Sequence, residues 1–235
     1  MPSGERLQFD SNINFVFETD HLRFASPATI SRMGIIFLSE EDVSVEAVVS
    51  TWIDRQPEEV RPNLTQWFRM IFYQALDFLE KQPKDGLYGI ATTRMGTVSN
   101  ILGQLTFVER VHRDSVSVKE FTLAVAKGFC CNIVNPRIRD QLAQMIFEWA
   151  NVVPPDTRSP LNCWYNRDVG SLEYYDPRMR DISFDEIITD DTMPMIPTVA
   201  SMRDMAFFSM PLAAGQPISV VGPSGCGKDM LIRNA

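Results

Sequence analysis

Apolar residues recur every three or four positions between residues 43 and about 151, which is the period of α-helices with one buried face. One predicted face carries Trp67, Ile71, Ala75, Phe78 and Leu79. A second carries Val98, Ile101, Leu102, Leu105 and Val108. Two further helices are predicted over residues 118–129 and 136–150, the latter with Met145, Ile146 and Trp149 in the core. Aromatic and methionine side chains at this spacing form a helical core far more often than a ligand pocket, so we predict a bundle without a site.

Short apolar runs rich in β-branched residues lie on both sides of this region. Residues 13–17 and 35–38 are each predicted to form a buried strand, separated by a short helix over residues 28–32. Ser26 is a suitable cap for that helix because Pro27 follows it at the first helical position. A third run, residues 217–221, has the composition of another buried strand. These runs indicate α/β layers at both ends of the chain.

The helical period stops between residues 152 and 176, where prolines and paired aromatic residues follow one another. This segment is either a β-hairpin or an extended linker that packs aromatic side chains. The acidic stretch over residues 181–191 and the proline-containing residues 193–197 are interpreted as a connector. Thr198 then caps a predicted helix that runs to about residue 210.

Acidic residues outnumber basic ones by 30 to 22, which gives the 235-residue chain a formal charge of −8. This balance disfavours nonspecific binding to nucleic acid or to an anionic membrane. The four cysteines have no C-x-x-C spacing, so we predict neither a metal site nor a disulfide framework, and a reducing intracellular compartment fits best. The N-terminus is polar and resembles no signal peptide, and the longest apolar runs are far too short to cross a bilayer.

The strongest chemical signal is a glycine-rich loop with a lysine, between the apolar run at residues 217–221 and a predicted helix that starts near Met230. Glycines let consecutive backbone N–H groups turn toward a phosphate, and the lysine reaches the terminal phosphates. We predict that ATP or ADP binds here; the alternative is a glycine-rich turn between a strand and a helix. The predicted nucleotide-binding residues are Gly222, Pro223, Ser224, Gly225, Cys226, Gly227, Lys228 and Asp229.

Asp229 departs from the loop pattern, because it replaces the Ser or Thr hydroxyl that ligates Mg²⁺. A carboxylate there adds negative charge beside the phosphates, which puts Mg²⁺ binding and hydrolysis in doubt. A nucleotide hydrolase also needs an acidic pair on a later strand, yet only residues 229–235 follow Lys228. We therefore expect that this chain does not hydrolyse ATP on its own and is a piece of a larger protein.

The predicted fold class is α/β plus all-α, arranged as the end of one module and the start of the next. We assign residues 1–42 to the last strands of an α/β subdomain and residues 43–151 to a helical subdomain. Residues 152–197 form a linker or hairpin, and residues 198–235 open a second α/β module with its phosphate loop.

This layout and its motifs resemble AAA+ motors, and specifically the dynein heavy chains. The resemblance covers essentially the whole chain and is carried by residues 3–6, 14–18, 25–39, 52 and 57–67 and by the phosphate loop. It identifies the first part as the closing strands and small subdomain of the second ring module, and the loop as that of the third. Within the family, the chain is most similar to the cytoplasmic dyneins of retrograde intraflagellar transport, with the axonemal heavy chains as the nearest alternative.

The resemblance implies a role for Arg32. It matches the arginine finger that points into the nucleotide site of the preceding module, where such a residue stabilises charge on the transferred phosphoryl group. Without the resemblance, a capping or salt-bridged arginine is the more common reading of Arg32. The third module is expected to bind nucleotide as a regulator, which agrees with Asp229.

The implied partners are the neighbouring AAA+ modules, and, through regions absent from this chain, microtubules and dynein accessory chains. The implied location is the cytoplasm and cytoskeleton, including a cilium or flagellum. Two alternatives from other classes remain open at this point: a nucleotide kinase, because a similar loop opens guanylate-kinase-like domains, and a noncatalytic helical interaction module.

Overall fold

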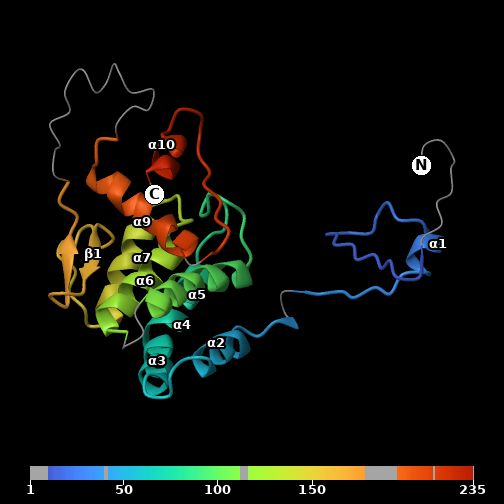
Figure 1. The fold of residues 1–235 in the computed structure, drawn as a ribbon, viewed down its shortest axis with the longest axis horizontal. Helices are drawn as coiled ribbons and strands as arrows, with labels where there is room; N and C mark the ends of the chain where they lie inside the picture. The colour runs from blue at the N-terminus through green and yellow to red at the C-terminus, as the bar shows by residue number, and fades with distance from the viewer. Residues whose placement is uncertain (1–9, 40–41, 112–115, 178–194, 214, 235) are drawn as a thin grey trace. The chain divides into compact units, whose positions relative to one another are not determined.

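The computed structural model describes residues 10–39, 42–111, 116–177, 195–213 and 215–234, and these fall into two units. We call them the N-terminal unit, Met1–Ser39, and the main unit, Glu40–Ala235. Figure 1 traces both as ribbons. The acidic stretch predicted over residues 181–191 lies outside the described residues.

The main unit is built on helices that follow one another with short connections (Figure 1). Helix α6 packs against both α5 and α7, and α2 packs against α3 and α5. One long helix is interrupted by a π-helical turn, η2, between α3 and α4. The bounds are α2 Val45–Asp54, α3 Arg61–Trp67, η2 Phe68–Phe72, α4 Tyr73–Glu80, α5 Arg94–Val111, α6 Val118–Cys130 and α7 Pro136–Trp149.

Side-chain caps explain where several of these helices begin. The hydroxyl oxygen of Ser44 accepts a hydrogen bond from the backbone N–H of Ala47 at the start of α2, and Ser117 does the same for α6. Asn135 caps α7, whose first residue is Pro136, a position that needs no N–H donor. The helices predicted over residues 118–129 and 136–150 are therefore confirmed to within a residue of each end.

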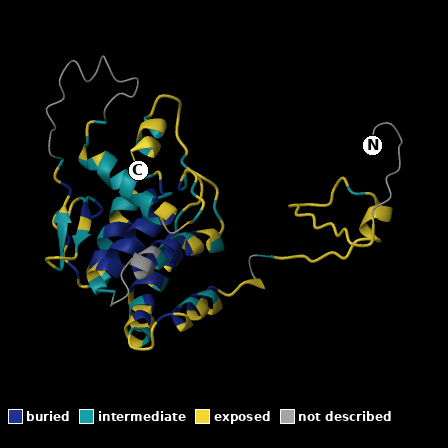
Figure 2. Cartoon of the chain, viewed as in Figure 1, coloured by how far each residue is buried: buried dark blue, intermediate teal, exposed yellow. Residues whose placement is uncertain are grey.

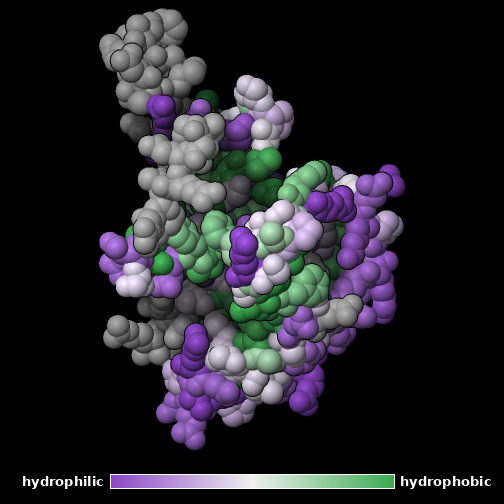
Figure 3. All heavy atoms as spheres, turned by 90° about the vertical axis from the view of Figure 1, so that its right-hand side faces the viewer, coloured by the Kyte–Doolittle hydropathy of each residue, from purple (hydrophilic) through white to green (hydrophobic). Residues whose placement is uncertain are grey.

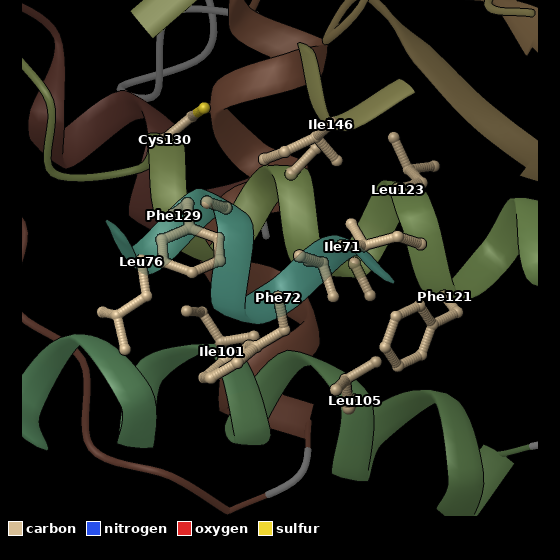
Figure 4. Packing of buried hydrophobic residues seen from close by; sticks show 14 of the residues in the cluster. Ile71, Phe72, Leu76, Ile101, Leu105, Phe121, Leu123, Phe129, Cys130 and Ile146 are labelled. Carbon is tan, nitrogen blue, oxygen red and sulfur yellow. The ribbon is translucent and has the colours of Figure 1, made fainter. Parts of the chain in front are cut away.

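The core of the bundle is formed by the apolar faces of these helices (Figure 2). Figure 4 shows side chains from the interrupted helix, α5 and α6 meeting in this core. Phe72 packs near Phe129, with ring centroids 5.5 Å apart, and Phe68 contacts Phe121 edge-on at 5.3 Å. The predicted α5 face is confirmed, because each of its members is buried: Val98, Ile101, Leu102, Leu105 and Val108.

The other two predicted faces are confirmed in part. Ile146 is fully buried on α7, but Met145 and Trp149 are half-buried, and Trp149 packs on the outside of the core. On the interrupted helix, Trp67 and Phe78 are also half-buried. Phe68 and Phe72, at the two ends of the π turn η2, are buried on this helix as well, although the predicted face did not include them.

Residues 163–174 form a β-hairpin, which settles the open alternative for this segment. Strand β1, Cys163–Asn166, pairs antiparallel with β2, Ser171–Tyr174. Gly170 closes the turn with a φ of 68°, a conformation that glycine adopts without strain. The hairpin packs against α6.

Two more helices of the main unit lie in its last described residues. Helix α9, Val199–Ala213, is capped by the hydroxyl of Thr198, which accepts a hydrogen bond from the N–H of Ser201 as predicted. It packs against α5 of the bundle and against α10, Lys228–Arg233. The buried strand predicted over residues 217–221 is wrong for this structure: the segment is not a strand among the described residues, and Val221 is exposed.

The N-terminal unit contains the predicted short helix, α1, Pro27–Ile30, with Ser26 as its cap and proline at its first position. The buried strands predicted over residues 13–17 and 35–38 are wrong for this structure: neither is a strand, and Val16 and Phe37 are 96% and 84% exposed. Residues 10–39 offer no partner strand, so the backbone ladder cannot form. Apolar side chains of these residues accordingly reach the surface. Figure 3 colours the described residues of the whole chain by hydropathy and shows green hydrophobic atoms between purple hydrophilic ones on one face.

No helix among the described residues is long and apolar enough to span a membrane.

Candidate functional site: a phosphate loop and an exposed arginine

The predicted phosphate loop leads directly into helix α10, and its glycines have identifiable geometric causes. Gly225 and Gly227 have φ angles of 78° and 87°, in the left-handed region that strains other residues. Gly222 has a steric cause instead, since a Cβ atom there would lie 2.8 Å from the sulfur of Cys226. Each of these three glycines thus has a conformational or steric cause, which agrees both with a phosphate loop and with a glycine-rich turn.

Lys228 folds back over this loop. Its Nζ donates hydrogen bonds to the carbonyl oxygens of Gly222, at 2.9 Å, and Pro223, at 2.6 Å. These two carbonyls hold the ammonium group beside the loop, and no carboxylate of the described residues forms an ion pair with it. An anion bound at the loop would supply the missing negative charge.

Helix α10 starts at Lys228 without a side-chain cap, because Gly227 occupies the cap position. The first hydrogen bond of the helix runs from the N–H of Leu231 to the carbonyl of Gly227, at 3.0 Å. The N–H groups that precede Leu231 have no helical acceptor and are available to a ligand. The start of α10 and the ammonium of Lys228 thus both lie at the predicted phosphate loop.

Most of the loop is open to solvent, from Gly222 to Cys226, while Gly227 and Lys228 are half-buried. Three cavities of about 300, 380 and 470 Å³ occur elsewhere in the described main unit, and no residue of 222–229 lines them. A bound nucleotide needs walls around its base and sugar as well as a phosphate cradle. The three cavities offer no such walls beside residues 222–229.

Asp229 lies in the first turn of α10 and is exposed. Its carboxylate lies next in sequence to the ammonium of Lys228 and opposes an incoming anion electrostatically. Among the residues that the structure describes, no group of three or more His, Cys, Asp or Glu side chains is arranged to hold a metal ion. All four cysteines, Cys130, Cys131, Cys163 and Cys226, are free thiols.

Arg32 follows α1 in the N-terminal unit, where its backbone N–H donates to the carbonyl of Thr29 at 3.2 Å. The residue is exposed, and within the described part of the chain its guanidinium forms neither an ion pair nor a hydrogen bond. The salt-bridged alternative considered for this arginine therefore has no support in the structure.

Comparison with known proteins places these features in a family. Residues 44–150, which include the helical bundle, match a family model described as the AAA+ ATPase domain of cytoplasmic dynein 2 heavy chain 1. Over its full length, the chain is 39% identical to human cytoplasmic dynein 2 heavy chain 1 and 32% identical to that of Caenorhabditis elegans. The chain belongs to the dynein heavy-chain family.

More distant dyneins also match. The chain is 25% identical to human dynein axonemal heavy chain 9 over 244 residues. The comparisons thus agree with the resemblance inferred from the motifs, including the preference for a cytoplasmic over an axonemal dynein. The chain spans about 5% of the length of each of these dynein heavy chains.

Sequence patterns missed a buried polar cluster between α6 and the hairpin of this dynein heavy-chain segment. Lys127 is 1% exposed, and its Nζ donates to the hydroxyl of Tyr175 at 3.4 Å. Burial lowers the pKa of Lys127 to about 8 and raises the pKa of the Cys163 thiol to about 11. Burial likewise raises the pKa of Tyr175. The one available signal was a lysine inside an otherwise apolar stretch of helix.

An ion pair holds the hairpin nearby. The guanidinium of Arg167 donates to both carboxylate oxygens of Glu120, each at 2.8 Å from Nη2, and Glu120 is almost completely buried. Lys119 adds a hydrogen bond from its Nζ to the carbonyl of Gly170 at 2.8 Å. These contacts fix the hairpin on α6 and involve no residue of the phosphate loop.

Proposed function

We propose that this chain is part of the AAA+ ring of a dynein heavy chain, where its phosphate loop binds ATP or ADP. The loop geometry carries this proposal: left-handed glycines curl the backbone, and Lys228 presents an unneutralised ammonium beside free N–H groups. The 39% identity to a dynein heavy chain over the whole length favours this function over a nucleotide kinase or an interaction module.

We further propose a regulatory rather than hydrolytic role for this loop. Asp229 lies in the position of the hydroxyl that would ligate Mg²⁺, and its negative charge disfavours a metal-bound triphosphate in a hydrolytic geometry. A phosphate loop that retains its lysine but not this hydroxyl can still hold nucleotide. Nucleotide occupancy would then act on the ring through conformation and not through turnover at this loop.

Arg32 is proposed as an arginine finger for the neighbouring module that precedes it in the ring. Its exposure and its lack of a carboxylate partner among the described residues are what such a role requires. The whole heavy chain would be an ATP-driven, minus-end-directed microtubule motor. By similarity to cytoplasmic dynein 2, it would work with accessory chains in retrograde intraflagellar transport within a cilium or flagellum, with an axonemal dynein as the alternative.

The loop assignment is tested in the full-length heavy chain by counting bound nucleotides per chain after rapid gel filtration. Lys228→Ala should remove one bound nucleotide, because it deletes the cation that faces the phosphates. Arg233→Ala is the matched control, since it removes an exposed positive charge from the same helix, and it should leave the count unchanged. An unchanged count in the Lys228 variant would refute nucleotide binding at this loop.

The finger assignment has its own experiment. Arg32→Ala in the full-length heavy chain should lower the ATP turnover rate by about 10³-fold or more while nucleotide affinity changes little. Arg23→Ala removes another exposed arginine of the same unit and should leave turnover unaltered. Equal turnover in the Arg32 variant and the unmodified chain would rule the finger out.

A further inference from the structure

Helix α9, which leads toward the phosphate loop, contains a proline in its interior at position 211. Proline has no backbone N–H, so the carbonyl oxygen of Phe207, four residues earlier, loses its helical donor. The pyrrolidine ring also pushes that carbonyl away from the helix axis. Pro211 is buried, and a buried carbonyl needs a hydrogen-bond donor from elsewhere.

Gln104 of α5 supplies that donor. Its Nε2 lies 2.8 Å from the carbonyl oxygen of Phe207, and the residue is 0% exposed. Because a carbonyl can only accept, the amide must present its nitrogen to Phe207, and Oε1 then has no partner within the described part of the structure. A buried amide with one orphaned oxygen is costly, which indicates that its position is dictated by the bond to Phe207.

Gly103, the residue before Gln104 on α5, lies beside the chain that follows α9. Helix α9 terminates in a Schellman arrangement, in which the N–H of Gln216 donates to the carbonyl of Pro211 at 2.9 Å and that of Gly215 donates to Leu212. The side chain of Gln216 occupies the space beside Gly103: a Cβ atom at Gly103 would lie 2.1 Å from Oε1 of Gln216. Gln104 of α5 thus bonds to α9, and Gly103 leaves room for the side chain of Gln216 after it.

The contact between α5 and the end of α9 is linked to the phosphate loop both by packing and in sequence. Helix α10, which begins at the loop lysine, packs against α9, and only residues 217–221 separate Gln216 from the loop. We propose that Gln104 is a positioning residue for the phosphate loop: it donates the hydrogen bond that Pro211 cannot, and so fixes α9 and α10 on the bundle. Its importance for nucleotide binding rests on the proposed function of the loop.

The proposal predicts a specific rescue. Gln104→Leu leaves the Phe207 carbonyl without a donor, whereas adding Pro211→Ala restores a backbone N–H that reaches the same carbonyl. The melting temperature is a poor measure, because leucine also removes the orphaned Oε1. Hydrogen exchange in peptides that cover α9 and residues 222–234 of the complete 235-residue chain measures local opening instead.

Exchange in both segments should become about tenfold faster in Gln104→Leu and return to within about twofold of the original rate in the double variant. Thr106→Val is the matched control, since Thr106 lies on the same helix as Gln104 but its hydroxyl bonds to Nε1 of Trp52 on α2, at 3.0 Å, and to the carbonyl of Leu102. It should leave exchange in α9 unchanged. Equal exchange in the single and double variants, or unchanged exchange in Gln104→Leu, would overturn the proposal.

Binding of radiolabelled ATP separates this inference from the function proposed for the loop. If the loop binds ATP, Gln104→Leu should weaken binding by about fivefold or more and the double variant should recover it. In the full-length heavy chain, an unchanged count of bound nucleotides in Lys228→Ala would count against the proposed function. The hydrogen-exchange rescue would still decide whether Gln104 positions α9 and α10.

Discussion

Two regions of this chain are similarly apolar in sequence and differ in burial. In the bundle, Phe72 and Phe121 are 0% exposed, whereas Val16 and Phe37 of the N-terminal unit are 96% and 84% exposed (Figure 2). A helix satisfies its own backbone and can bury a face against helices that follow in sequence. A strand must first find a second strand. Local apolar pattern therefore predicts burial well for a helix, which needs only a surface to pack on, and less well for a strand, which also needs a paired edge.

The sharpest test of this difference is one substitution made in both regions. Phe72→Ala should lower the free energy of unfolding by about 3–5 kcal/mol, because it leaves a cavity among packed rings. Phe37→Ala removes the same atoms from an exposed position and should change stability by less than about 0.5 kcal/mol. Urea unfolding measures both values. Similar losses in the two variants would mean that residues 35–38 are buried in solution.

The helices and their caps could be predicted from sequence because their hydrogen bonds join residues that are close together in the chain. Asn135 followed by Pro136 marks the start of α7 within a few residues, and Thr198 marks α9. The π turn at 68–72 could not be predicted, because it depends on how one helix packs against several others. The hairpin was one of two alternatives, and its docking on α6 by Arg167 involves residues 47 apart in sequence.

In the candidate site, too, local features could be predicted from sequence and long-range contacts could not. Glycines with positive φ follow from local chain geometry, so the phosphate loop is visible in the sequence. Gln104 was not, because the carbonyl that it serves lies 103 residues away and is freed by a proline that looks like an ordinary helix breaker. Long-range polar contacts of this kind leave little trace in hydrophobic periodicity.

The second test compares a buried lysine with an exposed one. Burial lowers the pKa of Lys127 from 10.5 to about 8, so between these values the unfolded chain binds more protons and stability rises with pH. The cost of the buried charge is fully present below pH 8 and amounts to about 3 kcal/mol. Lys127→Met removes it, so the variant should gain stability over the unmodified chain most clearly at pH 7.

Urea unfolding at pH 7, 8 and 9 measures this effect, and the stability difference between the two chains should shrink as pH rises. Higher pH is avoided because burial raises the pKa of Cys163 to about 11, and deprotonation of thiols in the unfolded chain above pH 9 opposes the lysine effect. Lys81→Met, at an exposed ion pair, should show no such pH dependence. A constant difference for Lys127→Met would show that this amine is solvated.

The third test contrasts two ion pairs of the main unit. Arg167→Gln breaks the pair with Glu120, which is only 8% exposed, and should cost about 2 kcal/mol because it leaves a desolvated carboxylate. Arg158→Gln breaks a pair with Asp156 whose arginine is 92% exposed, and should cost less than about 0.5 kcal/mol. Urea unfolding at one pH compares them directly. An equal, small loss in both would contradict a docked hairpin.

The smallest expected effect compares helix caps in the two units. Ser44→Ala removes the acceptor for the N–H of Ala47 and should destabilise the bundle by about 1 kcal/mol, because α2 carries buried Val45, Val49 and Ile53 that transmit the loss to the core. Ser26 caps α1 in the same manner, at 3.1 Å from the N–H of Thr29, but α1 has four residues and buries none. Ser26→Ala should therefore leave the urea midpoint of the bundle unchanged. A shift as large as that of Ser44→Ala would mean that α1 is coupled to the bundle core and that the contrast between the two units is false.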